Sequence, residues 1–419
     1  MIGFIISALK IIFVLGFLIL IHEGGHFLVA KLFKVNVSEF SIGFGKEIIS
    51  RKKKETKYVL RMIPLGGYVN MLGEEERSKE EGSFSELSIP KRIAIVAAGG
   101  LVNIVFGIIT YFVLMTIVAN NFYSTKIDTI KEGYAAEIAG IQEDDEIIKI
   151  DGKKIHYYKD VSKILQKSNG ETLAVEVKRG DETLEFDLKP TEKIDNSIGI
   201  FLGNEEDASL KIQYLYEGMP AEKEGIKVGD VITEVNGEKI DDYKRLVEII
   251  DEAEKEVEIK VDRKGEEEQF TVPIEKVSSY YLGTTFKEDE KTIFNRLHHG
   301  FWETKDFCFS LIDNVKKIVT GNISKNQLMG PVGISNTVAK TSTVHDFVYL
   351  LALISLSLGI TNLLPFPALD GGRILLLIIE WVRRKPLKEN TEITIQLIGF
   401  SLLILLSIYV SYNDILRIF

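Results

Sequence analysis

Cysteine is almost missing from this chain of 419 residues, and its scarcity excludes two kinds of site. The single cysteine, Cys308, can form no disulfide within the chain and cannot build a cysteine-rich metal centre. An excess of positive charge is also lacking. The formal net charge is -10, and most of it belongs to the middle of the chain, which argues against nucleic-acid binding.

Long apolar runs, by contrast, are plentiful. Four of them reach or nearly reach the roughly 20 residues that span a bilayer. They cover residues 3–33, 93–119, 346–380 and 394–412, whereas residues 121–295 are dense in Asp, Glu and Lys. We therefore expect a polytopic α-helical membrane protein with four transmembrane helices and a soluble insert. The first run has no basic leader and no small-residue cleavage site, so we expect it to be retained rather than removed as a signal peptide.

Basic residues predict the orientation in the membrane, because they favour cytoplasmic loops. They concentrate in residues 50–57, after the first apolar run, and in residues 382–390, between the third and the fourth. The insert and both termini are then extracytoplasmic. A further stretch, 295–321, has apolar residues at helical spacing but charges throughout, which is typical of an amphipathic helix at the membrane interface.

The insert contains an internal repeat. Residues 132–155 align without gaps to residues 217–240, with about eleven identities in some two dozen positions. In each copy a strand ends in an Asp-Gly or Asn-Gly turn and is followed by a helix and paired strands. The pattern "EGIKVGDVITEVNG" resembles the permuted bacterial PDZ domain, a small α/β fold. The resemblance implies two PDZ domains, 121–195 and 196–278, that bind peptide ends by strand addition. The alternative is that they only shield the membrane portion.

The first apolar run carries "HEGGH", an unusual set of ionisable residues for a bilayer helix. In H-E-x-x-H on a helix, His22 and His26 lie on one face and can ligate one zinc ion, and Glu23 can act as general base. The motif is short and matches by chance in soluble helices. Here the apolar surroundings favour the metal site, because unpaired ionisable groups are costly in hydrocarbon.

A catalytic zinc site needs a third protein ligand. The other four histidines are expected at the surface: His156, His298, His299 and His345. The alternative is Asp370, in the third apolar run. His22 lies 12 residues before the basic Lys34, and Asp370 lies 13 residues before Arg383, so both have a similar depth below the cytoplasmic face. Prolines and glycines near Asp370 must interrupt that helix, which the membrane tolerates only where protein or water surrounds the backbone.

Together these motifs resemble the site-2 protease family of intramembrane zinc metalloproteases, of the bacterial regulator-of-sigma-E protease type. The motifs are HEGGH, "FSIGFG" (40–45), G-x-x-N in the second run, the PDZ repeats, "GPVGI" (330–334) and N-x-x-P-x-P-x-L-D-G-G (362–372). Two positions depart from the family pattern: Lys46 and Leu101 stand where members commonly have proline.

The resemblance implies that His22, His26 and Asp370 hold Zn2+ and that Glu23 activates water. It also implies that Asn362 contacts the substrate backbone or the developing oxyanion; an Asn in a span can equally form a helix-packing hydrogen bond.

Residues 35–72 are rich in β-forming residues and predict a membrane-associated β-hairpin, whose unpaired edge could bind a substrate. The resemblance carries this role over to five residues by strand addition: Ser41, Ile42, Gly43, Phe44 and Gly45. The alternative is a purely structural hairpin.

The expected domains are a first membrane part (1–120), the two PDZ domains, a linker with the interfacial helix (279–344) and a second membrane part (345–419). The expected function is cleavage of transmembrane segments of single-span proteins, such as anti-sigma factors or remnant signal peptides, in a bacterial inner or cell membrane, with the active site toward the cytoplasmic leaflet. Expected partners are these substrates, peptide ends at the PDZ domains and the lipid bilayer. A rival is a non-catalytic PDZ chaperone or adaptor, although an intact Glu23 argues against it. A transporter would show pseudo-symmetric membrane halves, whereas the repeat lies only in the insert.

Overall fold

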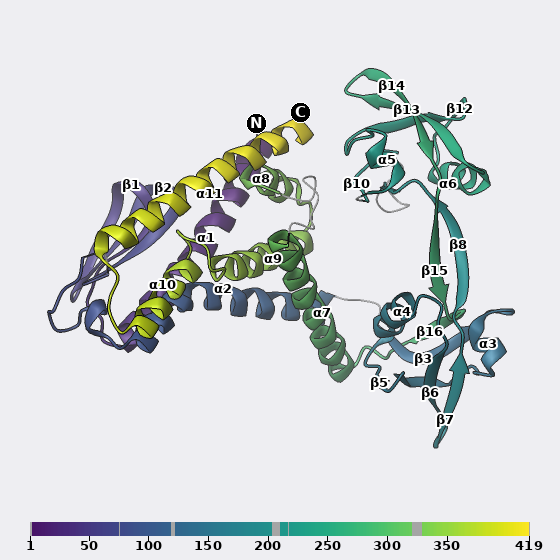
Figure 1. Ribbon diagram of the computed structural model, residues 1–419, viewed down its shortest axis with the longest axis horizontal. Helices are drawn as coiled ribbons and strands as arrows, with labels where there is room; N and C mark the ends of the chain where they lie inside the picture. Colours follow the sequence, from purple (N-terminus) through teal and green to yellow (C-terminus); the bar gives the residue numbers. More distant parts are fainter. Residues whose placement is uncertain are drawn as a thin grey trace. The chain divides into compact units, whose positions relative to one another are not determined.

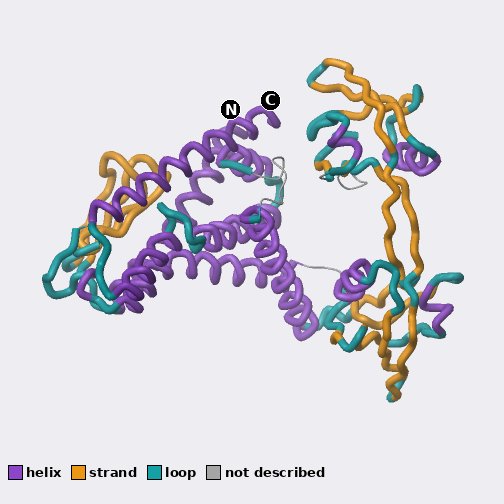
Figure 2. Tube along the Cα trace, viewed as in Figure 1, coloured by secondary structure: helices purple, strands orange, loops and turns teal. Residues whose placement is uncertain are grey.

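The computed structural model describes residues 2–74, 76–118, 122–202, 210–216, 218–320 and 329–418. The chain divides into two compact units, Met1–Ala119 with Arg296–Leu416 and Asn120–Asn295 with Arg417–Phe419. The first unit is mostly helical with one patch of strands, and the second is rich in strands (Figure 2). The expected boundary at residues 120 and 121 lies outside the described residues.

The helices of the first unit are long (Figure 1). They are α1 (Ile2–Leu32), α2 (Ile89–Val118), α7 (Ile293–Val319), α8 (Pro331–Lys340), α9 (Val344–Asn362), α10 (Asp370–Arg383) and α11 (Glu389–Ile418), with a short 3₁₀ helix at Phe84–Glu86. Within the described parts of the chain, four segments are long and apolar enough to cross a membrane: Ile5–Leu32, Ile89–Val118, Val344–Asn362 and Asn390–Leu416. The sequence-based expectation of four such helices is confirmed.

The third of these helices is shorter than the expected 346–380. It ends at Asn362, and α10 begins only at Asp370. Pro365 and Pro367 lie between them, and tight turns replace the helical hydrogen bonds, including one from the Phe366 amide to the Leu364 carbonyl. The interruption was predicted from these residues, but its width was not.

Helices α2 and α9 pack closely through glycines. A Cβ at Gly359 would lie 2.5 Å from the Gly100 carbonyl oxygen, and one at Gly107 would lie 2.9 Å from the Ala352 carbonyl oxygen. Backbones can approach this closely only where side chains are missing, which is how small residues hold membrane helices together.

The "GPVGI" motif caps helix α8. The carboxylate of Asp414, which is 1% exposed, accepts hydrogen bonds from the amides of Gly330 (2.9 Å) and Gly333 (2.8 Å). A Cβ at either glycine would lie less than 3 Å from this carboxylate. The motif therefore gives α11 access to the N-terminus of α8, where a negative charge is favourable.

A β-hairpin of β1 (Val37–Lys53) and β2 (Thr56–Met71) follows α1. Each strand bends midway, so β1 pairs twice with β2: Ser41 faces Tyr68 on one side and Val59 on the other. The bend falls where Gly43 and Gly45 have positive φ, a conformation that glycine adopts without strain. The predicted hairpin exists, but it is folded back into a broader sheet.

The second unit consists of two similar α/β halves. Its helices are α3 (Ala135–Ala139), α4 (Tyr158–Lys167), α5 (Pro220–Lys223) and α6 (Tyr243–Glu252). Its strands are β3 (Tyr123–Ile130), β4 (Glu146–Ile150), β5 (Lys153–Lys154), β6 (Leu173–Arg179), β7 (Glu182–Leu188), β8 (Thr191–Ser197), β9 (Ile200–Phe201), β10 (Tyr214–Leu215), β11 (Val231–Val235), β12 (Glu238–Lys239), β13 (Glu256–Arg263), β14 (Glu266–Pro273), β15 (Glu275–Tyr281) and β16 (Thr284–Glu288).

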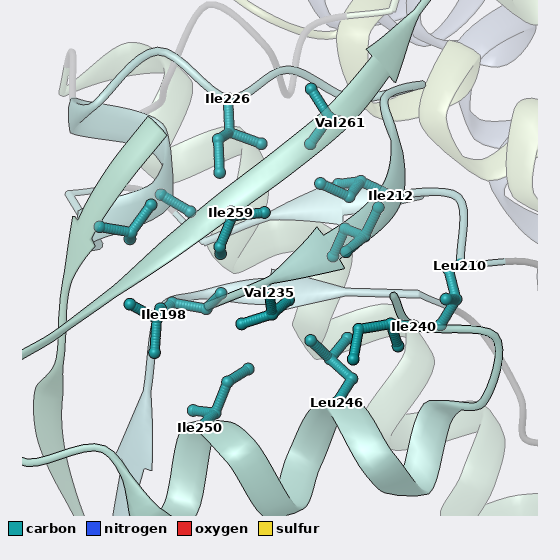
Figure 3. Packing of buried hydrophobic residues seen from close by; sticks show 14 of the residues in the cluster. Ile198, Leu210, Ile212, Ile226, Val235, Ile240, Leu246, Ile250, Ile259 and Val261 are labelled. Atoms are coloured by element: carbon teal, nitrogen blue, oxygen red, sulfur yellow. The ribbon is translucent and has the colours of Figure 1, made fainter. Parts of the chain in front are cut away.

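Each half has its own core. In the second half, Leu246 and Ile250 of α6 face Ile259 and Val235 of the sheet (Figure 3), and all four are nearly inaccessible. Each half also contains an ion pair with a buried aspartate, at an equivalent position. Asp145 binds Arg179 in the first half, and Asp230 binds Arg263 in the second, both at 2.7 Å. These equivalent contacts extend the sequence repeat into three dimensions.

The second half is inserted into the first. Strands β8 and β15 pair along their whole length, so the chain returns to the first half after completing the second. There β16 pairs with β3, and Leu282 joins the core of the first half. Residues 279–281 and 284–288, expected in the linker 279–344, therefore lie in strands. Sequence reasoning missed this because the strands that pair are about 80 to 165 residues apart in the sequence.

Candidate active site

Helix α1 places His22 and His26 one turn apart, facing α2. Gly25 makes this approach possible, because a Cβ there would lie 2.6 Å from the Ala98 carbonyl oxygen. Gly99 of α2 lies directly beneath the imidazoles, and a Cβ there would lie 2.3 Å from His26 Nε2. The close packing of the two helices brings both rings to the interior of the first unit.

Three potential ligand atoms converge at this point. His22 Nε2 lies 3.2 Å from His26 Nε2, and Asp370 Oδ2 lies 3.3 Å and 3.5 Å from them. Ligands about 2.05 Å from a tetrahedral zinc ion are about 3.3 Å apart, so the triangle has the size of one face of such a site. Among the described residues, this is the one group of three or more His, Cys, Asp or Glu that could hold a metal ion.

Asp370 reaches this position from the first turn of α10. Gly371 and Gly372 let the helix fold back on the preceding loop, because a Cβ at either would lie about 2.2 Å from a loop carbonyl oxygen. Its Oδ2 is inaccessible to solvent and accepts no hydrogen bond from the described residues. An acceptor left this way is costly unless a cation approaches it. The donor set of two imidazoles and one carboxylate therefore fits zinc.

A cavity of about 840 Å³ opens beside the three residues. Glu23 lines it, next to both imidazoles and Asp370. The cavity is also lined by five consecutive residues of β2, Gly67–Met71. A Cβ at Gly67 would lie 3.1 Å from Glu23 Cγ, so the glycine leaves room for the carboxylate. The cavity thus has a carboxylate base and a β-strand side by side in its lining.

Comparisons with known proteins indicate a single protein family. The profile of peptidase family M50 matches residues 10–406. The chain belongs to this family. It is 30% identical to the regulator of sigma-W protease RasP of Bacillus subtilis, over 99% of this chain and 100% of that protein. It is 30% identical to the regulator of sigma-E protease RseP of Escherichia coli, over 100% of both chains.

Membership of family M50 confirms the prediction of a zinc metalloprotease in a membrane. Among solved structures, the PDZ domain of HtrA3 bound to a phage-derived ligand covers 21% of this chain and 93% of its own, with 22% identity and a TM-score of 0.19.

In this M50 chain Ser41 and Ile42, the first two of the five residues 41–45, do not form the exposed edge that the sequence suggested. Ser41 is fully buried, and it and Ile42 have strand partners on both sides, so their backbone is not free for strand addition. The Arg61 guanidinium holds the turn by donating to the Gly45 carbonyl and to Ser41 Oγ. The turn within "FSIGFG" is made by Gly43 and Gly45, and the strand segment that lines the cavity with pairing on one side only is Gly67–Met71.

Ion pairs surround the outer part of the cavity. Arg373 pairs with Glu74, Arg92 with Glu380 and Arg77 with Glu392, at 2.5, 2.6 and 3.2 Å. They link the segment after β2 to α10 and α11, and α2 to α10. The sequence suggested no partner for Glu74, since it and Arg373 are about 300 positions apart.

Asn362 lies at the end of α9, with its Nδ2 3.5 Å from His22 Nδ1. The structure therefore brings Asn362 to the candidate metal site together with His22, Glu23, His26 and Asp370. It also adds Asn103 of α2, whose Nδ2 lies 3.4 Å from the same His22 nitrogen. The G-x-x-N spacing in the second run was noted in the sequence, but it gave Asn103 no role.

The remaining histidines are absent from this site. One expectation for them was wrong: His299 is only 4% exposed. It lies on the buried face of α7, the face where Phe307 stacks on Tyr111 of α2 with ring centroids 3.9 Å apart. The helical pattern of 295–321 was recognised, but the side that packs against the protein was not.

Proposed function

We propose that this M50 protease cleaves transmembrane segments of single-span proteins, with zinc held by His22, His26 and Asp370. The observation that carries the proposal is the triangle of Nε2, Nε2 and Oδ2 atoms on helices apolar enough to cross a membrane. Bound zinc supplies Lewis-acid activation of water and of the scissile carbonyl.

The side chains divide the remaining work. The Glu23 carboxylate takes a proton from the attacking water and later delivers it to the leaving amine. The Asn362 amide donates a hydrogen bond to the substrate backbone or to the oxyanion as negative charge develops there.

A transmembrane helix must be unwound before its carbonyls can react, because its amides are locked in internal hydrogen bonds. The β2 segment Gly67–Met71 provides new partners for those amides. It lines the cavity, and its one strand partner among the described residues is β1. Strand addition on this segment positions the extended substrate beside Glu23.

The basic segments 50–57 and 382–390 support an active site toward the cytoplasmic leaflet and an extracytoplasmic insert, in a bacterial inner or cell membrane. Each half of the insert is then a PDZ domain. In the second half, a groove of about 320 Å³ between residues 198–202 and α6 is lined by Ile200, Leu246 and Ile250, and it suits an extended peptide end with an apolar side chain.

The experiment compares the unaltered protein, purified in detergent, with Glu23→Gln on reporters that contain one transmembrane segment. The expected result is cleavage within the segment by the unaltered protein and a rate lower by at least about 100-fold in Glu23→Gln, with zinc content unchanged. If both bind zinc and neither cleaves a reporter even with the insert deleted, the adaptor function replaces this proposal.

A further inference from the structure

The two imidazoles at the candidate zinc site are held differently. His26 Nδ1 lies 2.9 Å from the backbone carbonyl oxygen of Ile95. A carbonyl only accepts, so Nδ1 carries the proton and Nε2 keeps its lone pair for the metal. His22 has two side-chain amides near its Nδ1, those of Asn103 and Asn362.

Zinc on His22 Nε2 requires the proton of the neutral ring to be on Nδ1, which must then meet an acceptor. Asn103 has one to offer. Its side chain is completely buried, and its Oδ1 has no hydrogen-bond partner among the described residues. The two ends of an amide have the same shape, and exchanging them turns Oδ1 toward His22 Nδ1. After this exchange, His22 Nδ1–H donates to Asn103 Oδ1, so each of the two atoms has a hydrogen-bond partner.

The two asparagines differ in what else they can do. Asn103 is enclosed between α1, α2 and α9, and Ser355 of α9 donates to its backbone carbonyl at 2.9 Å. Asn362, at the C-terminal end of α9, is partly exposed. A buried amide can position a ring but cannot reach a substrate, whereas an exposed one can.

From this arrangement we infer that Asn103 is a positioning residue for zinc binding. It accepts the hydrogen bond from His22 Nδ1, fixes the ring with Nε2 toward the metal, and leaves the Asn362 amide free for the substrate. The inference rests on the proposed function, because it requires His22 to be a zinc ligand.

The test measures zinc affinity of the purified full-length protein by competition with a chromophoric chelator, and the absorption spectrum of the cobalt form. Asn103→Leu removes the acceptor and is expected to weaken zinc binding by about 10- to 100-fold. Asn103→Asp keeps an oxygen acceptor and is expected to retain the affinity and the cobalt spectrum. Asn362→Leu is expected to lose turnover while it binds zinc normally.

Ser355→Ala is the matched control, because it removes a buried hydrogen bond to the same residue without touching the side-chain amide. It should leave zinc affinity unchanged. Unaltered affinity in Asn103→Leu overturns the inference, as does a loss in Ser355→Ala equal to that in Asn103→Leu. If Asn103→Leu does not fold, the zinc affinity of Asn103→Asp is the test. A tenfold loss of zinc affinity in Asn103→Asp would overturn the inference.

His22→Ala tests the proposed zinc site separately from the role of Asn103. If it binds zinc normally, the proposed zinc site itself fails. If it loses zinc while Asn103→Leu does not, only the role of Asn103 fails.

Discussion

The two units bury carboxylates in opposite ways. In the insert, Asp145 is fully buried, and its oxygens accept from Arg179 and from the Gln142 amide. Asp230 repeats the arrangement, accepting from the Arg263 guanidinium and from the Lys227 backbone amide. In the membrane unit, Asp370 buries an oxygen that faces only two imidazole nitrogens. A buried carboxylate that is paired with an arginine stabilises the fold. A buried carboxylate oxygen that has no donor and faces the lone pairs of two imidazole nitrogens is suited to binding a cation instead.

The strongest test of this difference is to neutralise one carboxylate of each kind. Asp370→Asn is expected to weaken zinc binding by more than about 100-fold, because a charged ligand is lost, yet to leave the metal-free protein as stable as before. Asp145→Asn is expected to leave zinc binding unchanged and to destabilise the first half of the insert by about 2 kcal/mol. Chelator competition and hydrogen exchange of the full chain measure the two effects. The distinction between a metal-binding and a fold-stabilising carboxylate fails if Asp370→Asn destabilises the metal-free protein as much as Asp145→Asn destabilises the insert.

Glycine substitutions test whether the close approach of α2 positions the His26 ring. In Gly99→Ala the new methyl would lie 2.3 Å from His26 Nε2, so we expect zinc affinity to fall by at least about tenfold as the ring is displaced. Gly24 is the control, since a Cβ there has nothing within 4 Å. Gly24→Ala should bind zinc normally. Equal losses in both would mean that the helix, not the ring, is disturbed.

Acid should weaken the insert through its paired carboxylates. Burial raises the pKa of Asp145, but the Arg179 guanidinium and the Gln142 amide outweigh it, so the pKa lies below the ordinary 3.8. The stability that this pair contributes is therefore complete above about pH 4 and is lost as pH falls through the lowered pKa. Hydrogen exchange of the first half should accelerate below pH 4 in the unaltered chain. The acceleration should be smaller in Asp145→Asn, and an identical profile in the two would contradict the assignment.

The smallest effect is expected at the neighbouring residue. Lys126 and Lys287 lower the pKa of Asp144 to about 2, but the side chain is exposed to solvent. Exposed ion pairs contribute little because water screens them. Asp144→Asn should leave hydrogen exchange at neutral pH unchanged, and a clear destabilisation would show that exposure does not distinguish the two neighbours.

Much of the site could be predicted from local sequence patterns. The H-E-x-x-H spacing fixes two imidazoles on one face of a helix, and matched distances to basic residues brought Asp370 to the same depth. Asn103 and Ile95 could not be assigned roles this way. Their contacts depend on how closely α2 approaches α1, which Gly25 and Gly99 decide by packing rather than by periodicity.

The fold shows the same limit. Apolar runs predicted the four long helices, and the repeat predicted two similar halves in the insert. Sequence order suggested that these halves follow each other, whereas β16 closes the first half after the second is complete. The hairpin was also predicted, but its bend at Gly43 and Gly45 turned the expected edge at Ser41 into a central position. Pairing between distant segments is a tertiary choice that local propensity does not encode.

X-ray absorption spectroscopy of zinc in the purified protein tests the central claim most directly. The account predicts about one zinc per chain, with nitrogen and oxygen neighbours at about 2.0–2.1 Å and the outer-shell scattering of two imidazoles. It also predicts that this signal disappears in Asp370→Asn. A zinc spectrum without imidazole scattering, or one that persists unchanged in Asp370→Asn, would contradict it.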